Sequence, residues 1–480
     1  MKKSIEIYHP GTFEPDNHFY PEVINADLHP ILKSFFNMSR EQLVERYLHL
    51  HPRVPREFIE TTLSYKCKHF RWSGADLIFV STGPGHRYSV VIETNSCPSG
   101  QKSMPFIDEN NPQKSYADVI NATIRDYVNK DKLNSGELAV FYDINEMESA
   151  GYASTMADIF NRPVYLAKLP QGGNPDVKFE DNFFHINHGG SWKKISACFR
   201  FVTQSPWDRI PVSCGTYILN PVLSCLGGGR NKLIAKKAYD LYNAEIKENN
   251  ISILSPETIT DISKEEIPLW IDKFGGFGVI KIPYGNCGQG IYTITNQEEL
   301  ERFMESDADY DQYIVQSLIG NYSWSSSGTA GKFFHLGTIP DRKNRIFVSD
   351  LRFMVCSSKK GFMPIAIYGR RARQPLTNTV PEGDSSWGML GTNLSYKDDD
   401  GILKSESSRL IMMDRKDFSQ LGIGLDDIIN SYMQTVLSTI AVDKMCKRLL
   451  TTKGKFKKKL FNSLNTDPKL LEQIYIGDDN

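Results

Sequence analysis

The spacing of apolar residues predicts helices near the beginning of the chain and a β-hairpin after them. Over residues 40–68 apolar positions recur every three to four residues, and Ser39 precedes acidic residues, as at a capped helix N-terminus. Two short apolar runs follow at 75–82 and 88–95, separated by the turn-rich segment GPGHR. We therefore expect a hairpin whose second strand runs into the loop SCPSGQKSMP.

Strand and helix patterns alternate in the next part of the chain. Residues 137–143 predict a strand, 146–160 a helix and 163–169 a second strand, and these lengths suit a βαβ unit with a right-handed crossover. After this unit, the pattern predicts a polar loop at 185–190 and a loop-rich transition from residue 198 to 211.

The second half of the chain predicts a strand-rich region between two helices, at 231–248 and 426–450. Thr295, three residues before Glu298, predicts the capping box of a further helix. The segment 374–401 is rich in Pro, Gly, Ser and Asp, and a loop of that length is usually a lid or a binding loop. Strands are expected at 277–283, 291–295, 312–319, 331–339, 345–357 and 361–372.

Composition narrows the class of protein. The 480 residues carry a net charge of -1, which argues against nucleic acid as the main partner because phosphate binding needs a basic surface. No stretch approaches 18 apolar residues, and the first residues lack an apolar segment behind their two lysines, so we expect neither a membrane span nor a signal peptide. The eight cysteines form no CxxC pair, which favours reduced thiols in a cytoplasmic globular protein.

A glycine-rich loop beside a lysine is the first candidate for chemistry. Lys281 stands at a predicted strand end and is followed by Gly285, Gly288 and Gly290. Glycines let backbone N–H groups close over phosphates, and a lysine neutralises phosphate charge. The loop lies between two strands, unlike a Walker A or Rossmann loop, so it would fold over a nucleotide as a flap. A glycine-rich hairpin in an ordinary sheet is the competing interpretation.

Oxygen-bearing side chains at the end of the hairpin are the second candidate. Glu93 and Asn95 are two residues apart on one strand, so both side chains leave the same face, and Asp76 can reach that face from the neighbouring strand. Two carboxylates and an amide oxygen suit Mg²⁺. The competing interpretation is a strand-end turn whose polar groups are solvated.

These two motifs together resemble the ATP-grasp superfamily, in which a strand lysine and a glycine-rich flap hold ATP and a Glu-x-Asn strand holds magnesium. The motifs DLR (350–352), YGRRAR (368–373) and GTNLS (391–395) follow the flap in the superfamily's order. Here, however, Glu-x-Asn precedes the flap. This order is similar to circularly permuted ATP-grasp ligases of the glutathionylspermidine synthetase type, without their amidase domain, over about residues 60 to 450.

The resemblance implies an α/β (α+β) protein with a permuted ATP-grasp core and a Rossmann-like domain before it. Residues 1–114 would hold the first helices and the metal-binding hairpin, and 115–225 the Rossmann-like pre-ATP-grasp domain. Residues 226–450 would form the nucleotide-binding subdomains, and 451–480 a basic tail whose lysines at 453–459 are either a solvated face or a contact for an anionic partner.

The resemblance also implies a reaction and a set of roles. An ATP-dependent carboxylate–amine ligase forms an acyl phosphate, from which an amine makes an amide with release of ADP and phosphate. Arg352 and Arg371 would hold either the γ-phosphate or the substrate carboxylate. Lys232, Lys281, Gly285, Gly288, Gly290 and Gln316 would bind ATP, and Asp76, Glu93 and Asn95 would bind Mg²⁺. Arg71 and Asn393 are further candidates without an assigned role.

Substrates would be a small-molecule or peptide carboxylate and an amine, and by analogy with the superfamily the chain could form a homodimer. Two other functions remain open. An ATP-grasp kinase would use the same fold and metal site but would need no amine. A regulatory or scaffold protein would keep the nucleotide pocket without turnover. No sequence motif identifies the acid or the amine substrate.

Overall fold

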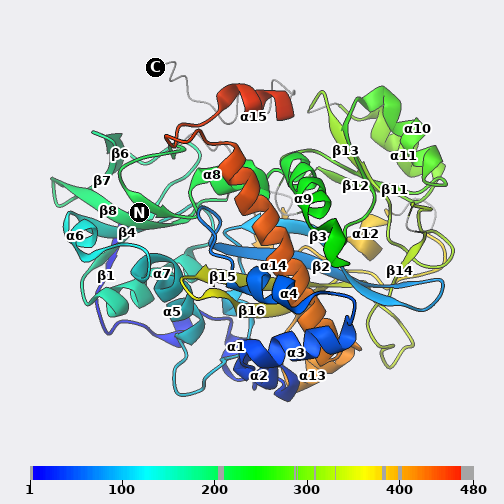
Figure 1. Cartoon of the computed structure of the whole chain (residues 1–480), viewed down its shortest axis with the longest axis horizontal. Coiled ribbons are helices and arrows are strands. Elements are labelled where there is room, and N and C mark those ends of the chain that lie inside the picture. Colours follow the sequence, from blue (N-terminus) through cyan, green and yellow to red (C-terminus); the bar gives the residue numbers. More distant parts are fainter. Residues whose placement is uncertain are drawn as a thin grey trace.

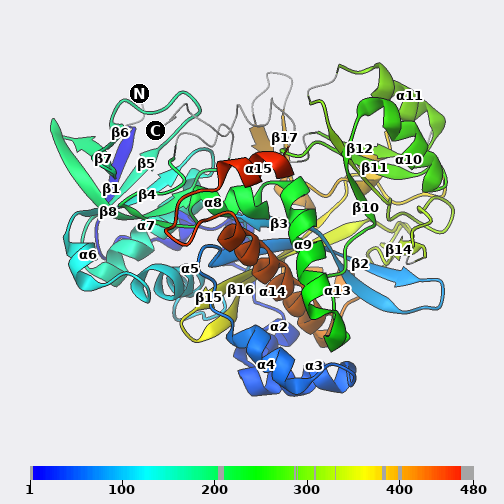
Figure 2. The same cartoon turned by 45° about the horizontal axis from the view of Figure 1, so that its top comes forward.

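The computed structural model describes residues 4–203, 210–285, 288, 290–307, 310–329, 331–380, 385–397 and 403–465. Within these residues the larger strands form sheets of six, four and seven strands, and two short strands form a ribbon. Figures 1 and 2 show the six-stranded sheet in the middle, with the other two sheets on opposite sides of it. The chain is therefore a mixed α/β protein.

The six-stranded sheet is antiparallel and is covered on one face by the long helix α14 (Leu425–Arg448). Ser73 and Ser89 bond Thr439 and Ser431 of this helix through their hydroxyls. Its strands are β2 (Trp72–Thr82), β3 (Arg87–Ser96), β14 (Phe333–His335), β15 (Ser349–Ser358), β16 (Gly361–Arg371) and β19 (Leu410–Ile411). A helix from the end of the chain thus lies on the early hairpin, as a permuted core requires; the permutation itself remains a prediction.

The predicted hairpin of β2 and β3 contains a β-bulge that the sequence does not reveal. Asp76 pairs with Glu93, but Leu77 pairs with Val91, so Ile92 is the extra residue. A bulge reverses which side chains face each side of a sheet. Before it, Ser89 faces α14; after it, Glu93 and Asn95 face away from α14 and line a cavity.

The four-stranded antiparallel sheet carries the glycine-rich loop. Its strands are β10 (Thr258–Ile262), β13 (Tyr313–Gln316), β11 (Gly278–Lys281) and β12 (Ile291–Ile294), flanked by α10 (Ile267–Lys273) and α11 (Gln297–Glu305). The prediction that Thr295 caps α11 is wrong. The cap is Asn296, which accepts a bond from the Glu299 backbone N–H, while Thr295 donates to the Glu299 carboxylate. Helix α9 (Lys232–Ile246) packs between this sheet and α14.

The seven-stranded mixed sheet includes the predicted βαβ unit. Strands β4 (Glu137–Tyr142) and β5 (Val164–Lys168) are parallel and joined by α7 (Glu146–Phe160), and β8 (Ser191–Phe201) continues the parallel pairing. Residues 185–188 of the expected polar loop are part of strand β7 (Phe183–His188), and only Gly189 and Gly190 form a turn. The first residues of the expected loop-rich transition belong to β8, which pairs with β7. The remaining strands are β1 (Ile5–Tyr8), β6 (Val177–Glu180) and β9 (Tyr217–Leu219).

Strand β1 pairs with β5, so the start of the chain shares a sheet with the segment 115–225. The predicted helical region is divided into α3 (Arg40–Leu50), which begins at the Ser39 capping box, and α4 (Arg56–Ser64). The other helices are α1 (Pro21–Ile24), α2 (Pro30–Asn37), α5 (Lys114–Ile120), α6 (Lys130–Asn134), α8 (Val222–Ser224), α13 (Arg415–Gln420) and α15 (Lys458–Leu464). The domain limits remain predictions.

The long segment expected to be a lid or binding loop contains local structure where it is described. It includes α12 (Trp387–Leu390) and β17 (Ser395–Lys397), which pairs with β18 (Leu403–Ser405). Residues 381–384 and 398–402 lie outside the described residues. Among the helices of the described part, none combines the length and apolar character that crossing a membrane requires.

Candidate active site

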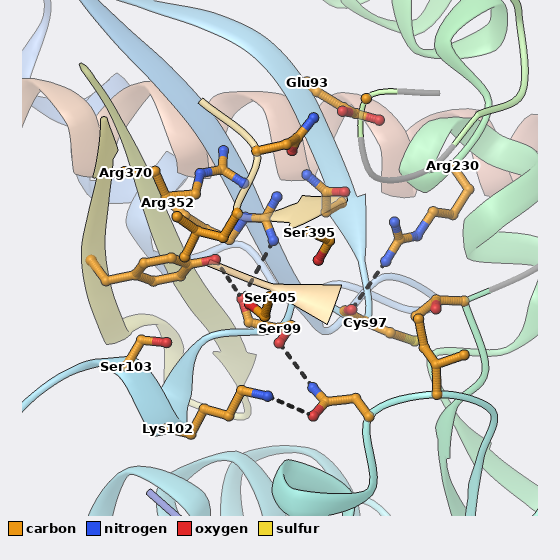
Figure 3. A pocket seen from close by; sticks show the side chains of 18 of the residues that line it. Glu93, Cys97, Ser99, Lys102, Ser103, Arg230, Arg352, Arg370, Ser395 and Ser405 are labelled. Atoms are coloured by element: carbon orange, nitrogen blue, oxygen red, sulfur yellow. Dashed lines mark hydrogen bonds between the residues drawn. The ribbon is translucent and has the colours of Figure 1, made fainter. Parts of the chain in front are cut away.

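The largest cavity that we describe, with a volume of about 260 Å³, lies where the three sheets approach one another (Figure 3). Its lining includes side chains from β3, the following loop, α9, β15 and β16, and the segment before β17. The sequence-predicted residues that line it are Glu93, Asn95, Lys232, Gly285, Gly288, Arg352 and Asn393. Segments far apart in sequence therefore supply one site.

Lys232 and Glu93 form the junction between this cavity and a smaller one. Lys232 is the first residue of α9, whose N-cap Asn231 accepts a bond from Ile234 N. Its Nζ donates to the Gly285 carbonyl at 2.9 Å and lies 3.3 Å from Glu93 Oε1. Both side chains line both cavities. A lysine and a carboxylate are thus held at the base of the glycine-rich loop.

Lys281, at the end of β11, lines the smaller cavity and is 4% exposed. Burial lowers the pKa of Lys281 to about 8; Glu93 opposes this shift and Lys232 adds to it. The buried charged form of a lysine is costly, so a ligand that brings negative charge would favour it. Gln316 lines the same cavity, and its Nε2 donates to Thr258 Oγ1 at 2.9 Å.

The glycines of the loop are needed where the backbone is left-handed. Gly288 has φ +78° and Gly290 has φ +68°. A Cβ on Gly290 would lie 2.2 Å from Ile282 Cδ1, and one on Gly288 would lie 2.6 Å from Asn393 Nδ2. The flap therefore approaches the segment that contains Asn393. Asn286, Cys287 and Gln289 lie outside the described residues.

Asp76 is held by two arginines on the cavity side of the sheet. Arg352 donates to both of its oxygens, Nε at 2.6 Å and Nη2 at 2.7 Å, and Arg370 Nη2 lies 3.0 Å from Oδ2. Arg370 also binds Asp350, which accepts a bond from Thr392 Oγ1. Burial alone would raise the pKa of Asp76, but the two guanidinium groups outweigh it and hold that pKa below its usual range.

Arg370 lines the cavity, whereas Arg371, the residue expected from the sequence, does not. Neighbouring residues of a strand point to opposite faces, and β16 pairs Arg370 with Asp350 on the cavity face. The Arg371 guanidinium instead lies 5.0 Å from the centre of the Phe347 ring, and Arg371 is not among the lining residues. Arg71 also lies away from the cavity: it donates to Tyr217 Oη at 2.8 Å and stacks on Tyr127 at 3.8 Å.

The proposed metal ligands fit unequally. Asn95 is 2% exposed, lines the cavity, and its Nδ2 has no hydrogen-bond partner within the described residues. Because Nδ2 is a hydrogen-bond donor, this unpaired group suits an acceptor such as a phosphate oxygen rather than a metal ion. Glu93 is partly exposed and contacts Lys232. Both oxygens of Asp76 are used by arginines. Glu93 thus keeps a carboxylate that is not held by an arginine, Asn95 would contribute to a metal only through its Oδ1, and Asp76 would be open to a metal only if Arg352 moved.

Sequence reasoning missed the residues that shape the loop after β3. Glu148, in the first turn of α7, is fully buried and accepts bonds from Ser99 Oγ, the Gly100 and Gln101 N–H groups and Asn145 Nδ2 at 2.9–3.1 Å. The sequence signal was an acidic residue at the start of a helix after a buried strand, a signal shared by many ordinary helices.

Two arginines that the sequence analysis did not select hold the same loop. Arg230 donates to the Cys97 carbonyl at 3.1 Å (Figure 3). It also donates to the Ser96 carbonyl at 3.0 Å, and buried Arg200 donates to Ser96 Oγ at 3.1 Å. Cys97 has φ +54°, and burial raises the pKa of its thiol. This thiol donates to the Arg200 carbonyl, so it is a neutral packing group.

No protein-family model matches the chain, and no curated protein matches it. Among solved structures, it resembles a RimK domain protein ATP-grasp from Sphaerobacter thermophilus, with 14% identity, 48% of this chain and 90% of the other covered, and a TM-score of 0.27. It resembles a glutathione synthetase-like effector from Globodera pallida at 9% identity, with 72% of this chain and 86% of the other covered and a TM-score of 0.37. It also resembles D-alanyl-alanine synthetase A from Vibrio cholerae at 12% identity, with 54% of this chain and 93% of the other covered and a TM-score of 0.30. The solved structures that this chain resembles thus include an ATP-grasp protein.

Proposed function

We propose that the chain is an ATP-dependent carboxylate–amine ligase that makes an amide through an acyl phosphate and releases ADP and phosphate. The observation that carries this proposal is the meeting of Lys232, Lys281 and Glu93 at the glycine-rich loop. Lys232 and Glu93 also line the larger cavity, which contains Arg352 and Arg370. Phosphoryl transfer needs such concentrated positive charge and little covalent participation by the protein.

The nucleotide would occupy both cavities. Its base would lie in the smaller one, beside Gln316 and Thr258, and its phosphates would pass Lys281 and Lys232 toward the larger one. The backbone of Gly285, Gly288 and Gly290 would close over the phosphates as the flap, because the left-handed glycines allow the loop to turn tightly. The path of the phosphates is supported by Glu93 and Lys232, which line both cavities.

Magnesium would be held by Glu93 and Asn95 together with phosphate oxygens. When bound there, Mg²⁺ would neutralise the charge that develops on the transferred phosphoryl group. Arg352 and Arg370 would orient the carboxylate and the γ-phosphate with their planar donor groups, and Asp76 and Asp350 keep these two arginines in place. The proposal therefore gives Asp76 a positioning role and transfers the role of Arg371 to Arg370.

Product analysis tests the function. The chain is incubated with Mg²⁺-ATP and pools of amino acids, short peptides and polyamines, and nucleotides and new masses are measured. We expect ADP and a product whose mass equals acid plus amine minus water. ADP together with a phosphorylated alcohol, formed without an amine, would instead establish the kinase. ATP that binds and is never consumed with any pool would favour the regulatory function.

The depressed pKa of Lys281 predicts a pH-dependent affinity for ATP. Lys281 is protonated below its pKa of about 8 and neutral above it in the nucleotide-free protein. Since phosphate binding needs the protonated form, we expect the dissociation constant for a non-hydrolysable ATP analogue to rise as pH increases from 7 to 9. Calorimetric titration across this range checks it. Lys281→Met should bind the analogue more weakly at pH 7 and lose this pH dependence; an unchanged affinity would remove Lys281 from the site.

A further inference from the structure

The end of the larger cavity that lies away from Glu93 has its own cationic group. This end is formed by the loop after β3 and the start of α7, and Figure 3 shows Lys102 there, at the opposite side of the cavity from Glu93. The lining residues of this end are Tyr20, Ser99, Lys102, Ser103, Ile144 and Asn145. None of them is needed to explain binding of a nucleotide at the glycine-rich loop.

The loop that carries Lys102 is fixed before any ligand binds. The buried carboxylate of Glu148 accepts bonds from Ser99, Gly100 and Gln101, as described above, and the Tyr368 hydroxyl donates to the Ser99 carbonyl at 3.0 Å. Gly100 has φ +140°, and a Cβ there would lie 1.9 Å from Tyr368 Cε1, so no other residue fits. A preorganised loop can hold a ligand without an ordering cost.

Lys102 has no carboxylate partner within the described part of the chain. Its Nζ donates to Asn145 Oδ1 at 2.8 Å and lies 5.1 Å from the centre of the Tyr20 ring. Asn145 uses its Nδ2 on Ser99 and Glu148, which orients its Oδ1 toward the lysine. By contrast, Arg352 and Lys232 each contact a carboxylate in this cavity. The Lys102 end is thus built to present a positive charge.

We propose that Lys102 binds a carboxylate of the substrate other than the one that is activated. This inference rests on the proposed ligase function, which requires the reacting carboxylate to lie near Arg352 and the phosphates. Arg352 Nη1 lies 3.4 Å from the Ser99 carbonyl, so Arg352 stands between the glycine-rich loop and the Lys102 end. An ammonium group would be repelled by Lys102, whereas a carboxylate gains a charge-assisted hydrogen bond from Lys102 and a polar contact with the Ser103 hydroxyl, which lines the same end. The second carboxylate belongs either to a dicarboxylic acid substrate or to an amino-acid acceptor.

Binding measurements with matched acids and amides test this inference. They also show whether the second carboxylate belongs to the acid substrate or to the amine acceptor. In the presence of Mg²⁺ and a non-hydrolysable ATP analogue, dissociation constants are measured calorimetrically for glutarate against its monoamide, and, with the monoamide present, for glycine against glycinamide. We expect the carboxylate member of at least one pair to bind about tenfold or more tightly, the gain typical of a charged hydrogen bond. The first pair identifies the acid as the source and the second pair the acceptor amine.

Three variants make the test specific. Lys102→Gln should abolish the preference and Lys102→Arg, which keeps the charge, should retain most of it. Lys33→Gln, which removes a surface lysine that pairs with Glu109, should bind like the unchanged chain. A preference that survives Lys102→Gln, or the absence of a preference in both pairs, would overturn the inference. Affinity for the ATP analogue is measured separately; failure of the unchanged chain to bind it would contradict the proposed function instead.

Discussion

Replacing Glu93 with Gln is expected to abolish ATP turnover while the protein remains folded. Glu93 lies beside both phosphate-binding lysines of the proposal, at 3.3 Å from Lys232 Nζ and near enough to Lys281 to raise its pKa. It is also a proposed magnesium ligand. Glutamine keeps the size of the side chain, removes its charge and replaces one carboxylate oxygen with an N–H donor that can bind neither Mg²⁺ nor Lys232.

Two effects of Glu93→Gln would combine. Loss of the carboxylate would weaken magnesium binding, and removal of one preorganised electrostatic contact typically costs about 10²–10³-fold in kcat. In addition, the pKa of Lys281 would fall below about 8, because Glu93 now raises it. Less of Lys281 would then be protonated at pH 7 to 8. We expect turnover to fall by about 10³-fold or more.

ADP release with saturating Mg²⁺-ATP measures this effect, and circular dichroism with a thermal melt shows whether the fold is kept. Glu45→Gln serves as the matched control, since Glu45 is an exposed glutamate that pairs with Arg56 on the surface of the early helices. Turnover of Glu93→Gln within a few-fold of the unchanged chain would refute the assignment of Glu93 to the metal and phosphate site.

Much of the site was predictable because its motifs are local. Lys281 at a strand end followed by spaced glycines, and Glu93 and Asn95 two residues apart, carry their chemistry within a few positions of one another. In the structure Glu93 lines both cavities, Asn95, Gly285 and Gly288 line the larger one, and Lys281 lines the smaller one. Lys232 came from the order of motifs in the resemblance, and it lies at their junction.

The features that could not be predicted from the sequence depend on strand register and on contacts between distant segments. The bulge at Ile92 decides which face Glu93 uses, yet it depends on pairing with β2. Whether Arg370 or Arg371 faces the cavity depends on the register of β16 against β15, in which Arg370 pairs with Asp350. Strand β1, only four residues long, is defined by its pairing with β5 about 160 positions away. Such choices follow from tertiary partners and leave no local pattern.

Replacing Asp76 with Asn is expected to destabilise the protein more than any loss of metal binding would explain. Asp76 is 6% exposed and neutralises Arg352 and Arg370, whose side chains are 13% and 5% exposed. Breaking a buried ion pair by removing one partner typically costs about 3–5 kcal/mol, because the other charge stays buried without compensation. Asp350 still contacts Arg370, so the cost falls mainly on Arg352.

Urea denaturation provides the measurement, and the chain contains a matched control. Arg46 binds Asp426 with the same two-bond geometry, at 2.7 Å for both contacts, but the two side chains are 41% and 40% exposed. In water such a pair contributes little, so Asp426→Asn should lower the free energy of unfolding by only a small fraction of the Asp76→Asn effect.

The same pair of variants separates the two roles considered for Asp76. If Asp76 positions Arg352, Asp76→Asn lowers both the free energy of unfolding and turnover, while the magnesium concentration needed for half-maximal turnover stays nearly the same. If Asp76 is instead a direct ligand, that magnesium concentration rises at least tenfold and stability changes no more than in Asp426→Asn. The bidentate contact of Arg352 with both Asp76 oxygens favours the first result, because a carboxylate so occupied has no oxygen left for a metal until the arginine moves.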